Sequence, residues 1–165
     1  MATRLLKGVF VYLLLHLTLI AGFPNPRASL WHEVTKARQF GQPKTAIEKL
    51  ELIRAGAQAD NAHAEVIKAI ALRIIVENHL RGGSPEDKIT SFQGEIEKAP
   101  AIMRPAMEAI LAHWYWQYYQ QNRWNFMQRT QTAEPPGPDI RTWDLARILV
   151  EIDKHFAAAL SAEEL

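Results

Sequence analysis

Hydrophobic residues recur every three or four positions from residue 30 onward, as in amphipathic helices, and no stretch alternates hydrophobic and polar residues as a strand does. The predicted helices cover residues 30–41 and 43–59, a segment from a cap at Asp60 or Asn61 to Gly82, a segment from Pro85 toward Pro100, a segment from there to about Gln121, and residues 142–160. The third segment has a wide hydrophobic surface, so we expect it near the centre of the domain. The pattern therefore predicts an all-α fold of about six helices.

Glycine and proline residues mark where the predicted helices begin, weaken or end. Ser84 precedes Pro85, and Asp87 follows three residues after Ser84, an arrangement close to a capping box at the start of a helix. Gly94 lies in the middle of that helix and is expected to weaken it by up to about 1 kcal/mol relative to alanine. Residues 122–141 contain three prolines, so we predict an ordered surface loop there instead of a continuous helix.

The first predicted hairpin has some features of a helical repeat. Trp31 opens its first helix, Gly41 and Ala46 lie five residues apart at the turn, and Leu50 follows four residues later. This spacing partly resembles a tetratricopeptide repeat, although the rest of the consensus is missing and any antiparallel helix pair of this size would show a glycine at its turn and an alanine at its crossing. We therefore predict antiparallel hairpins of a tetratricopeptide-like or α-solenoid-like kind over residues 29–165.

Residues 1–28 have the three-part organisation of a secretory signal peptide. Arg4 and Lys7 precede a hydrophobic run over residues 8–23, which His16 interrupts and which is shorter than the roughly 20 apolar residues of a membrane-spanning helix. An uncleaved signal anchor is the alternative interpretation. Three cleavage points are compatible with the small residues present: after Ala21, after Gly22, or after Ala28. In either case the basic residues predict that the body of the chain is exported, with the membrane contacted only through this segment.

Composition narrows the functions that the body can have. The chain has 19 basic and 18 acidic residues, and without Arg4 and Lys7 the balance is 17 to 18, with no basic cluster beyond residue 30. A nucleic-acid binder would usually carry a basic patch, so no nucleic-acid partner is predicted. The chain has no cysteine, so disulfides, cysteine-ligated metals and thiol catalysis are absent.

No pattern of catalytic or metal-binding residues is present in the sequence. The histidines are scattered, and none belongs to an HExxH motif; they are His16, His32, His63, His79, His113 and His155. His113 has the most hydrophobic neighbourhood and is predicted to be a hydrogen-bonded core residue. Phosphate-binding loops and GxSxG elbows are also missing. We therefore predict neither an enzyme, nor a cofactor, nor a metal site.

The unusual feature is the aromatic run HWYWQYYQQNRWNFMQRTQT over residues 113–132. Its aromatic residues point to all sides of a helix, so a single hydrophobic stripe does not bury them all. One interpretation is a helix packed on two sides, by the third predicted helix and by the loop that follows. The other is an exposed surface for a partner, since Trp, Tyr and Arg are common in binding interfaces and the two arginines could stack on the rings. The candidate core or interface residues are Trp114, Tyr115, Trp116, Tyr118, Tyr119, Arg123, Trp124, Phe126, Arg129 and Trp143.

The run WYWQYYQQNRWNFMQRTQT, the turn PPGPDIRTWDL and the helix ARILVEIDKHFAAAL together resemble the amino-terminal region of large bacterial alpha-2-macroglobulin-like proteins. The first hairpin and the IEKAP segment at residues 96–100 are similar too, so the resemblance covers roughly residues 30–165. It implies an exported protein of the bacterial periplasm or cell envelope, in which β-sandwich macroglobulin domains that trap proteases follow a helical segment.

The chain departs from that family in one respect. The trapping machinery of the family is a bait region and, in some members, a Cys-Gly-Glu-Gln thioester, and this chain has no cysteine and no strand-rich region. It ends at residues 162–165, where relatives would continue, so we expect a truncated gene, a frame split from its neighbour, or a free-standing module. The expected function is a non-catalytic segment that docks onto downstream macroglobulin domains; the alternative is a free-standing tetratricopeptide-like envelope scaffold that binds a protein or peptide.

Overall fold

The computed structural model describes residues 25–129, 137 and 139–161 of the chain. The predicted signal peptide lies outside the described residues except for its last four positions. In the described part every regular element is a helix, which confirms the all-α prediction. The elements are α2 (Ala28–Gln39), α3 (Pro43–Ala59), α4 (His63–Leu80), α5 (Pro85–Lys98), the 3₁₀ turn η1 (Ala101–Met103), α6 (Arg104–Gln121), α7 (Arg123–Gln128), η2 (Ile140–Thr142) and α8 (Leu145–Leu160).

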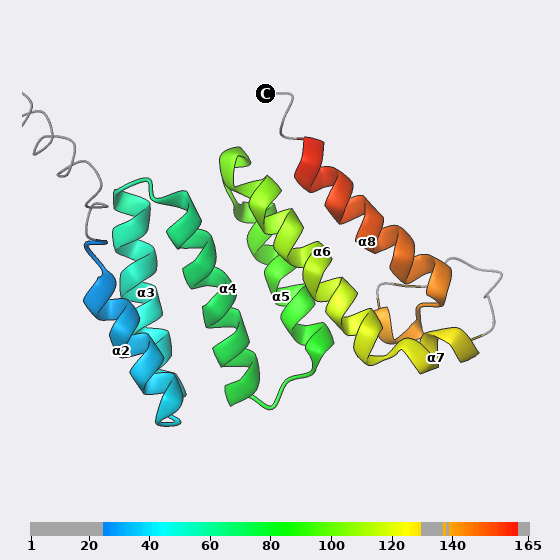
Figure 1. The fold of residues 1–165 in the computed structure, drawn as a ribbon, viewed down its shortest axis with the longest axis horizontal. Coiled ribbons are helices and arrows are strands. Elements are labelled where there is room, and N and C mark those ends of the chain that lie inside the picture. The colour runs from blue at the N-terminus through cyan, green and yellow to red at the C-terminus, as the bar shows by residue number, and fades with distance from the viewer. Residues whose placement is uncertain (1–24, 130–136, 138, 162–165) are drawn as a thin grey trace, which may run out of the picture.

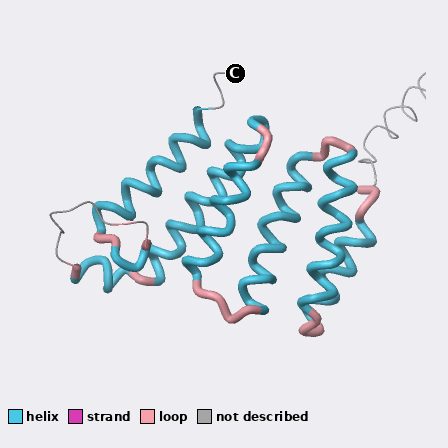
Figure 2. The backbone as a smooth tube through the Cα atoms, turned by 180° about the vertical axis from the view of Figure 1, so that it is seen from behind, coloured by secondary structure: helices cyan, strands magenta, loops and turns pink. Residues whose placement is uncertain are grey.

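The long helices follow one another across the molecule in a row from α2 to α8, in which α2 overlaps α3 and α6 overlaps α5 in this view (Figure 1). Successive long helices run in opposite directions, and their connections lie alternately at one end and at the other end of the helices (Figure 2). This arrangement is a helical array of the repeat type, in which each helix packs mainly on its neighbours in sequence. The pairs α3 with α4 and α6 with α8 pack closely.

Local sequence explains where several helices begin. Pro43 occupies the first turn of α3, where its missing N–H costs no hydrogen bond. At α5 the Ser84 hydroxyl accepts from the Asp87 backbone N–H, and the Asp87 carboxylate accepts from the Ser84 backbone N–H, so the predicted capping box is confirmed. Asp144 caps α8 in a similar way, by accepting from the backbone N–H of Arg147 at 2.8 Å.

The predicted cap of the third helix is wrong. Helix α4 begins at His63 after Ala62, and no side chain caps it. Asn61 instead adopts a left-handed conformation with φ of 55°, which reverses the chain between α3 and α4. Asp60 lies at the end of α3, and its carboxylate contacts the guanidinium of Arg27 at 2.5 Å. A long-range ion pair has therefore taken the side chain that the sequence suggested as a cap.

The predicted loop over residues 122–141 is only partly a loop. Residues Arg123–Gln128 form the short helix α7, and Ile140–Thr142 form a 3₁₀ turn. The buried side chain of Phe126 anchors α7 against α6. Helix α8 begins at Leu145, later than the predicted start at residue 142, because Asp144 supplies the cap.

Helix α4 packs on both sides, as its wide hydrophobic surface predicted. Ala69 belongs to a cluster with Leu50 of α3, whereas Ile70 and Ile74 belong to the largest cluster, which also contains Phe92 of α5. That largest cluster continues through α6 to α8 and supplies most of the buried apolar surface, the main source of stability in a chain without cysteine.

Replacement of Gly94 by alanine should stabilise the protein. A methyl group at Gly94 would meet no atom within 4 Å, so only the helix propensity changes. We expect Gly94→Ala to raise the free energy of unfolding by about 0.5 to 1 kcal/mol, measured by urea denaturation. The control is Gly83→Ala, whose methyl group would clash with the Asn78 amide; it should destabilise the protein. A loss of stability in Gly94→Ala would contradict the open space at that position.

Candidate interaction surface

Five of the ten candidate core or interface residues are core residues. They are Trp114, Tyr115, Tyr118, Phe126 and Trp143, each with at most 6% of its surface exposed. Their rings contact one another and their neighbours, with ring centres 4.8 Å apart for Phe92 and Trp114 and 5.9 Å apart for Tyr115 and Trp143. For these residues the core interpretation of the aromatic run is correct.

The packing partners of the run agree only in part with those expected: Phe126, in the segment after α6, packs on Tyr118 and Tyr119 as predicted, but the other partners differ. We predicted the third helix and the following loop as the two packing partners of α6. Trp114 instead packs on Phe92 of α5, and Tyr115 stacks on Trp143 and on His155 of α8. Helix α6 stands between α5 and α8 in the row, so its two buried sides face those neighbours (Figure 1).

The other aromatic residues of the run reach the surface. Trp116 is 42% exposed and Trp124 is 74% exposed, while Tyr119 is half-buried and its ring lies 5.5 Å from that of Trp116. Arg129 lies 5.2 Å from the centre of the Phe126 ring, which confirms the predicted stacking for this arginine. It also donates to the backbone oxygen of Trp143 at 2.6 Å. Arg123 is exposed, and no stacking contact joins it to an aromatic ring of the described residues.

The buried histidine of this region is His155, whereas His113 is exposed, so the prediction for His113 is wrong. His113 lies on the side of α6 that no neighbouring helix covers. The Nδ1 atom of His155 lies 2.5 Å from a carboxylate oxygen of Glu108, and its Nε2 atom lies 3.3 Å from Glu151. The contact with Glu108 joins α8 to α6, whereas the contact with Glu151 lies within α8.

Glu151 is a buried acid that pairs with basic side chains of its own helix. Its oxygens lie 2.6 Å from Lys154 Nζ and 3.0 Å from the Arg147 guanidinium. Burial alone would raise the pKa of Glu151, but the hydrogen bond from Lys154 and the positive charges of Lys154 and Arg147 outweigh it and lower the pKa. Arg147 also lies 4.9 Å from the centre of the Trp143 ring. The network therefore links the first turns of α8 to the buried ring of Trp143, which precedes the helix.

Helix α8 carries an apolar face that no described element covers, which we name the α8 face. It consists of Leu149, Phe156 and Leu160, which are 41%, 44% and 67% exposed. Their separations of seven and four residues place them on one side of the helix. A hollow of about 400 Å³, lined by Arg129, Asp144, Leu145, Ala146 and Leu149, lies at the start of this face.

The opposite end of the row is polar. Helix α2 exposes mainly polar side chains, among them His32, Lys36 and Gln39, and Phe40 just after its end is 68% exposed. Helical arrays need a polar outer face at a terminal helix to end in water. The α2 end meets this requirement, whereas the α8 face leaves the other end of the row open.

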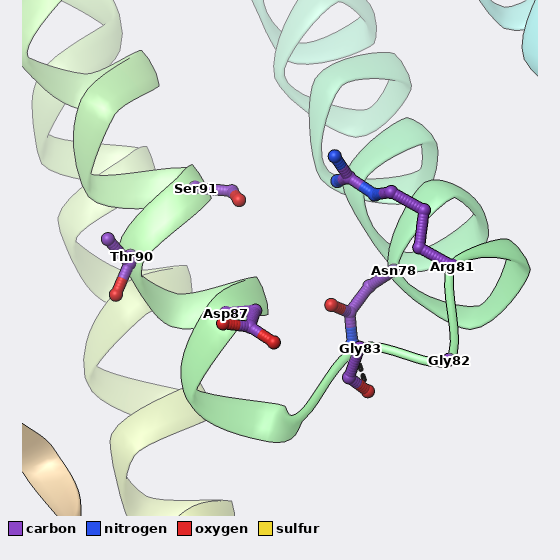
Figure 3. A pocket seen from close by; sticks show the side chains of 7 residues that line it. All are labelled: Asn78, Arg81, Gly82, Gly83, Asp87, Thr90 and Ser91. Carbon is purple, nitrogen blue, oxygen red and sulfur yellow. Dashed lines mark hydrogen bonds between the residues drawn. The ribbon is translucent and has the colours of Figure 1, made fainter.

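A polar hollow of about 590 Å³ lies between the end of α4 and the start of α5 (Figure 3). The fold already uses several of its polar groups. The Asn78 amide donates to the backbone oxygens of Gly83 and Ser84 at 3.2 and 3.0 Å, and Asp87 belongs to the capping box. Arg81, Thr90 and Ser91 line the rest of the hollow and are exposed. We interpret this hollow as the outside of a rigid turn.

Searches of the described residues found no group of three side chains able to hold a metal ion. None of the helices in that part of the chain is long and apolar enough to cross a membrane. Comparison of the chain with protein-family models, with curated proteins and with solved structures found no match.

Replacing Trp114 or Trp124 by alanine should show by the change in stability that the first is a core residue and the second a surface residue. We expect Trp114→Ala to lower the free energy of unfolding by about 3 to 5 kcal/mol, because it removes a buried ring next to Phe92. Trp124→Ala should change it by less than about 0.5 kcal/mol, because that ring is exposed. Urea denaturation monitored by circular dichroism measures both. Similar losses in the two variants would contradict the division of the cluster.

Proposed function

We propose that this chain is a non-catalytic docking module of the bacterial cell envelope and forms the amino-terminal part of an exported alpha-2-macroglobulin-like protein. The observation that carries the proposal is the α8 face, an apolar surface on the last helix of the row. An apolar terminal helix in a helical array is stabilised when another element stacks on it. The resemblance in residues 113–160 supplies the expected neighbour, the first macroglobulin domain that follows the helical segment.

The charges around the α8 face favour a different protein surface over a second copy of the chain. Asp153 lies within the face, between Leu149 and Phe156, and is exposed. The nearest cations of α8 in sequence, Arg147 and Lys154, are both held by Glu151. An antiparallel pairing of two copies about Asp153 would bring two carboxylates together, and a shifted pairing would cover the carboxylate with Phe156. A partner with a basic residue among apolar ones would satisfy both features.

The exposed aromatic residues support the second candidate function, a free-standing scaffold that binds an envelope protein or peptide. Trp116, Tyr119 and Trp124 are exposed or half-buried at the end of α6 and in α7. Exposed tryptophans with a nearby arginine, here Arg123, are common at the centres of binding interfaces. The two candidates use different surfaces, so substitutions can distinguish them.

The experiment measures binding of the chain to a protein made from the coding sequence that follows residue 165, by isothermal titration calorimetry. We expect that protein to contain macroglobulin domains and to bind the chain. Leu149→Glu should weaken this binding at least about tenfold, because it places a charge in the apolar contact. Leu52→Glu is the matched control, since Leu52 of α3 is 56% exposed and lies far from α8 in the row; it should bind normally.

Each contrary result points to a specific failure. The absence of macroglobulin domains from the coding sequence after residue 165 would overturn the assignment to that family. If Leu149→Glu binds normally but Trp124→Ala does not, the binding surface is the one formed by Trp116, Tyr119 and Trp124. That result would favour the free-standing scaffold. Self-association of the chain that Leu149→Glu abolishes would identify a second copy as the partner. Circular dichroism spectra of all variants establish that they are folded.

A further inference from the structure

A cluster of ion pairs and hydrogen bonds connects residues 25–27 to the end of α3 and the first turn of α4. The Arg27 guanidinium contacts Asp60 at 2.5 Å and Glu65 at 2.6 Å, and its Nε atom donates to Glu65 at 2.8 Å. The Asn25 amide donates to the other oxygen of Glu65 at 3.1 Å. The Trp31 indole N–H donates to that same oxygen at 2.6 Å.

This cluster is mostly shielded from water. The side chains of Arg27 and Glu65 are only 10% and 13% exposed, whereas that of Asp60 is 56% exposed. The Arg27 side chain runs along Gly56 of α3, where an added methyl group would lie 3.3 Å from its Cδ atom. The arginine is therefore packed into the domain as well as paired.

Backbone hydrogen bonds attach the same residues to the start of α2. The N–H of Ala28 donates to the Asn25 carbonyl at 3.0 Å, and the N–H of Trp31 donates to the Arg27 carbonyl at 3.0 Å. The side chain of Asn25 also accepts from the N–H of Arg27 at 2.8 Å. Residues 25–27 thus form the first turn of the folded domain.

A chain cut after Ala28 would lose this turn. The Glu65 carboxylate would then keep its hydrogen bond from Trp31 but would lose the Asn25 amide and the guanidinium of Arg27. A shielded carboxylate without its cation destabilises a folded protein more than loss of an exposed pair does. Hydrolysis after Ala21 or Gly22 keeps the whole cluster, since both positions precede Asn25.

We infer that residues 25–27 belong to the exported, folded domain and that a leader peptidase removes the signal peptide before Asn25, at the bond after Ala21 or Gly22. Water adds across that peptide bond, which leaves a new amino group on Gly22 or Phe23 and a carboxylate on the leader. The inference rests on the export that the proposed function includes.

The processed protein tests the position of the cut. We expect the full-length chain, expressed in a Gram-negative bacterium and recovered from the periplasm, to begin at Gly22 or Phe23 by intact mass and amino-terminal sequencing. A start at Ser29 would overturn the inference while leaving export intact. An exported chain that retains Met1 would also overturn it, in favour of a signal anchor. A full-length chain found only in the cytoplasm would contradict export itself.

Stability measurements test the contribution of residues 25–27 to the folded domain, and they do not depend on export. A chain produced to begin at Phe23 should melt at least about 5 °C above one that begins at Ser29. Arg27→Gln in the longer chain should lower the melting temperature in the same direction, whereas Arg38→Gln, at an exposed arginine of α2, should leave it unchanged. Equal melting temperatures for the two chains would overturn the inference.

The contribution of the cluster should also depend on pH. The hydrogen bond from Arg27 outweighs partial burial and lowers the pKa of Glu65. A carboxylate with a lowered pKa in the folded state stabilises the fold above its unfolded pKa of about 4.3, and the effect is lost as the pH falls through the folded value. We therefore expect the melting-temperature difference between the wild type and Arg27→Gln to be full at pH 7 and to shrink below about pH 4. A constant difference would argue against the Glu65 ion pair.

Discussion

The packing of large aromatic rings on two sides of α6 holds the second half of the row together. Trp114 packs against α5 through Phe92, and Tyr115 stacks on Trp143 and His155. These rings bury a large apolar area, and in a chain without cysteine such burial is the main favourable contribution to folding. The position of α8 follows from this packing, because its buried side chains face the rings. The polar contact between His155 and Glu108 of α6 also joins the two helices.

Because α8 is held by one side only, its other side is available. Helix α2 also ends the row, but its outward residues are charged or polar, whereas α8 presents Leu149, Phe156 and Leu160. The two ends of the row are therefore not equivalent. A helical array with one polar and one apolar end has a direction in which it can continue, and this property connects the fold to the proposed docking function.

The first half of the row is fastened differently. Its hydrophobic clusters are smaller, and a charged cluster around Glu65 joins the residues before α2 to α4. Arg27 takes part through both its side chain and its backbone, so the boundary of the folded domain lies before α2. The boundary thus depends on side chains of Asp60 and Glu65, more than 30 residues further along the chain.

The sequence by itself determined the helical class, most helix boundaries and the capping box at Ser84, because these depend on residues within one or two turns of each other. Only the tertiary structure decided which aromatic residues are core, because burial depends on the helices that happen to be neighbours. For the same reason hydrophobic context misidentified His113, and the carboxylate at Asp60, expected to cap α4, pairs instead with Arg27. Contacts between residues that are far apart in the chain produce no local sequence pattern, so they could not be predicted from the sequence.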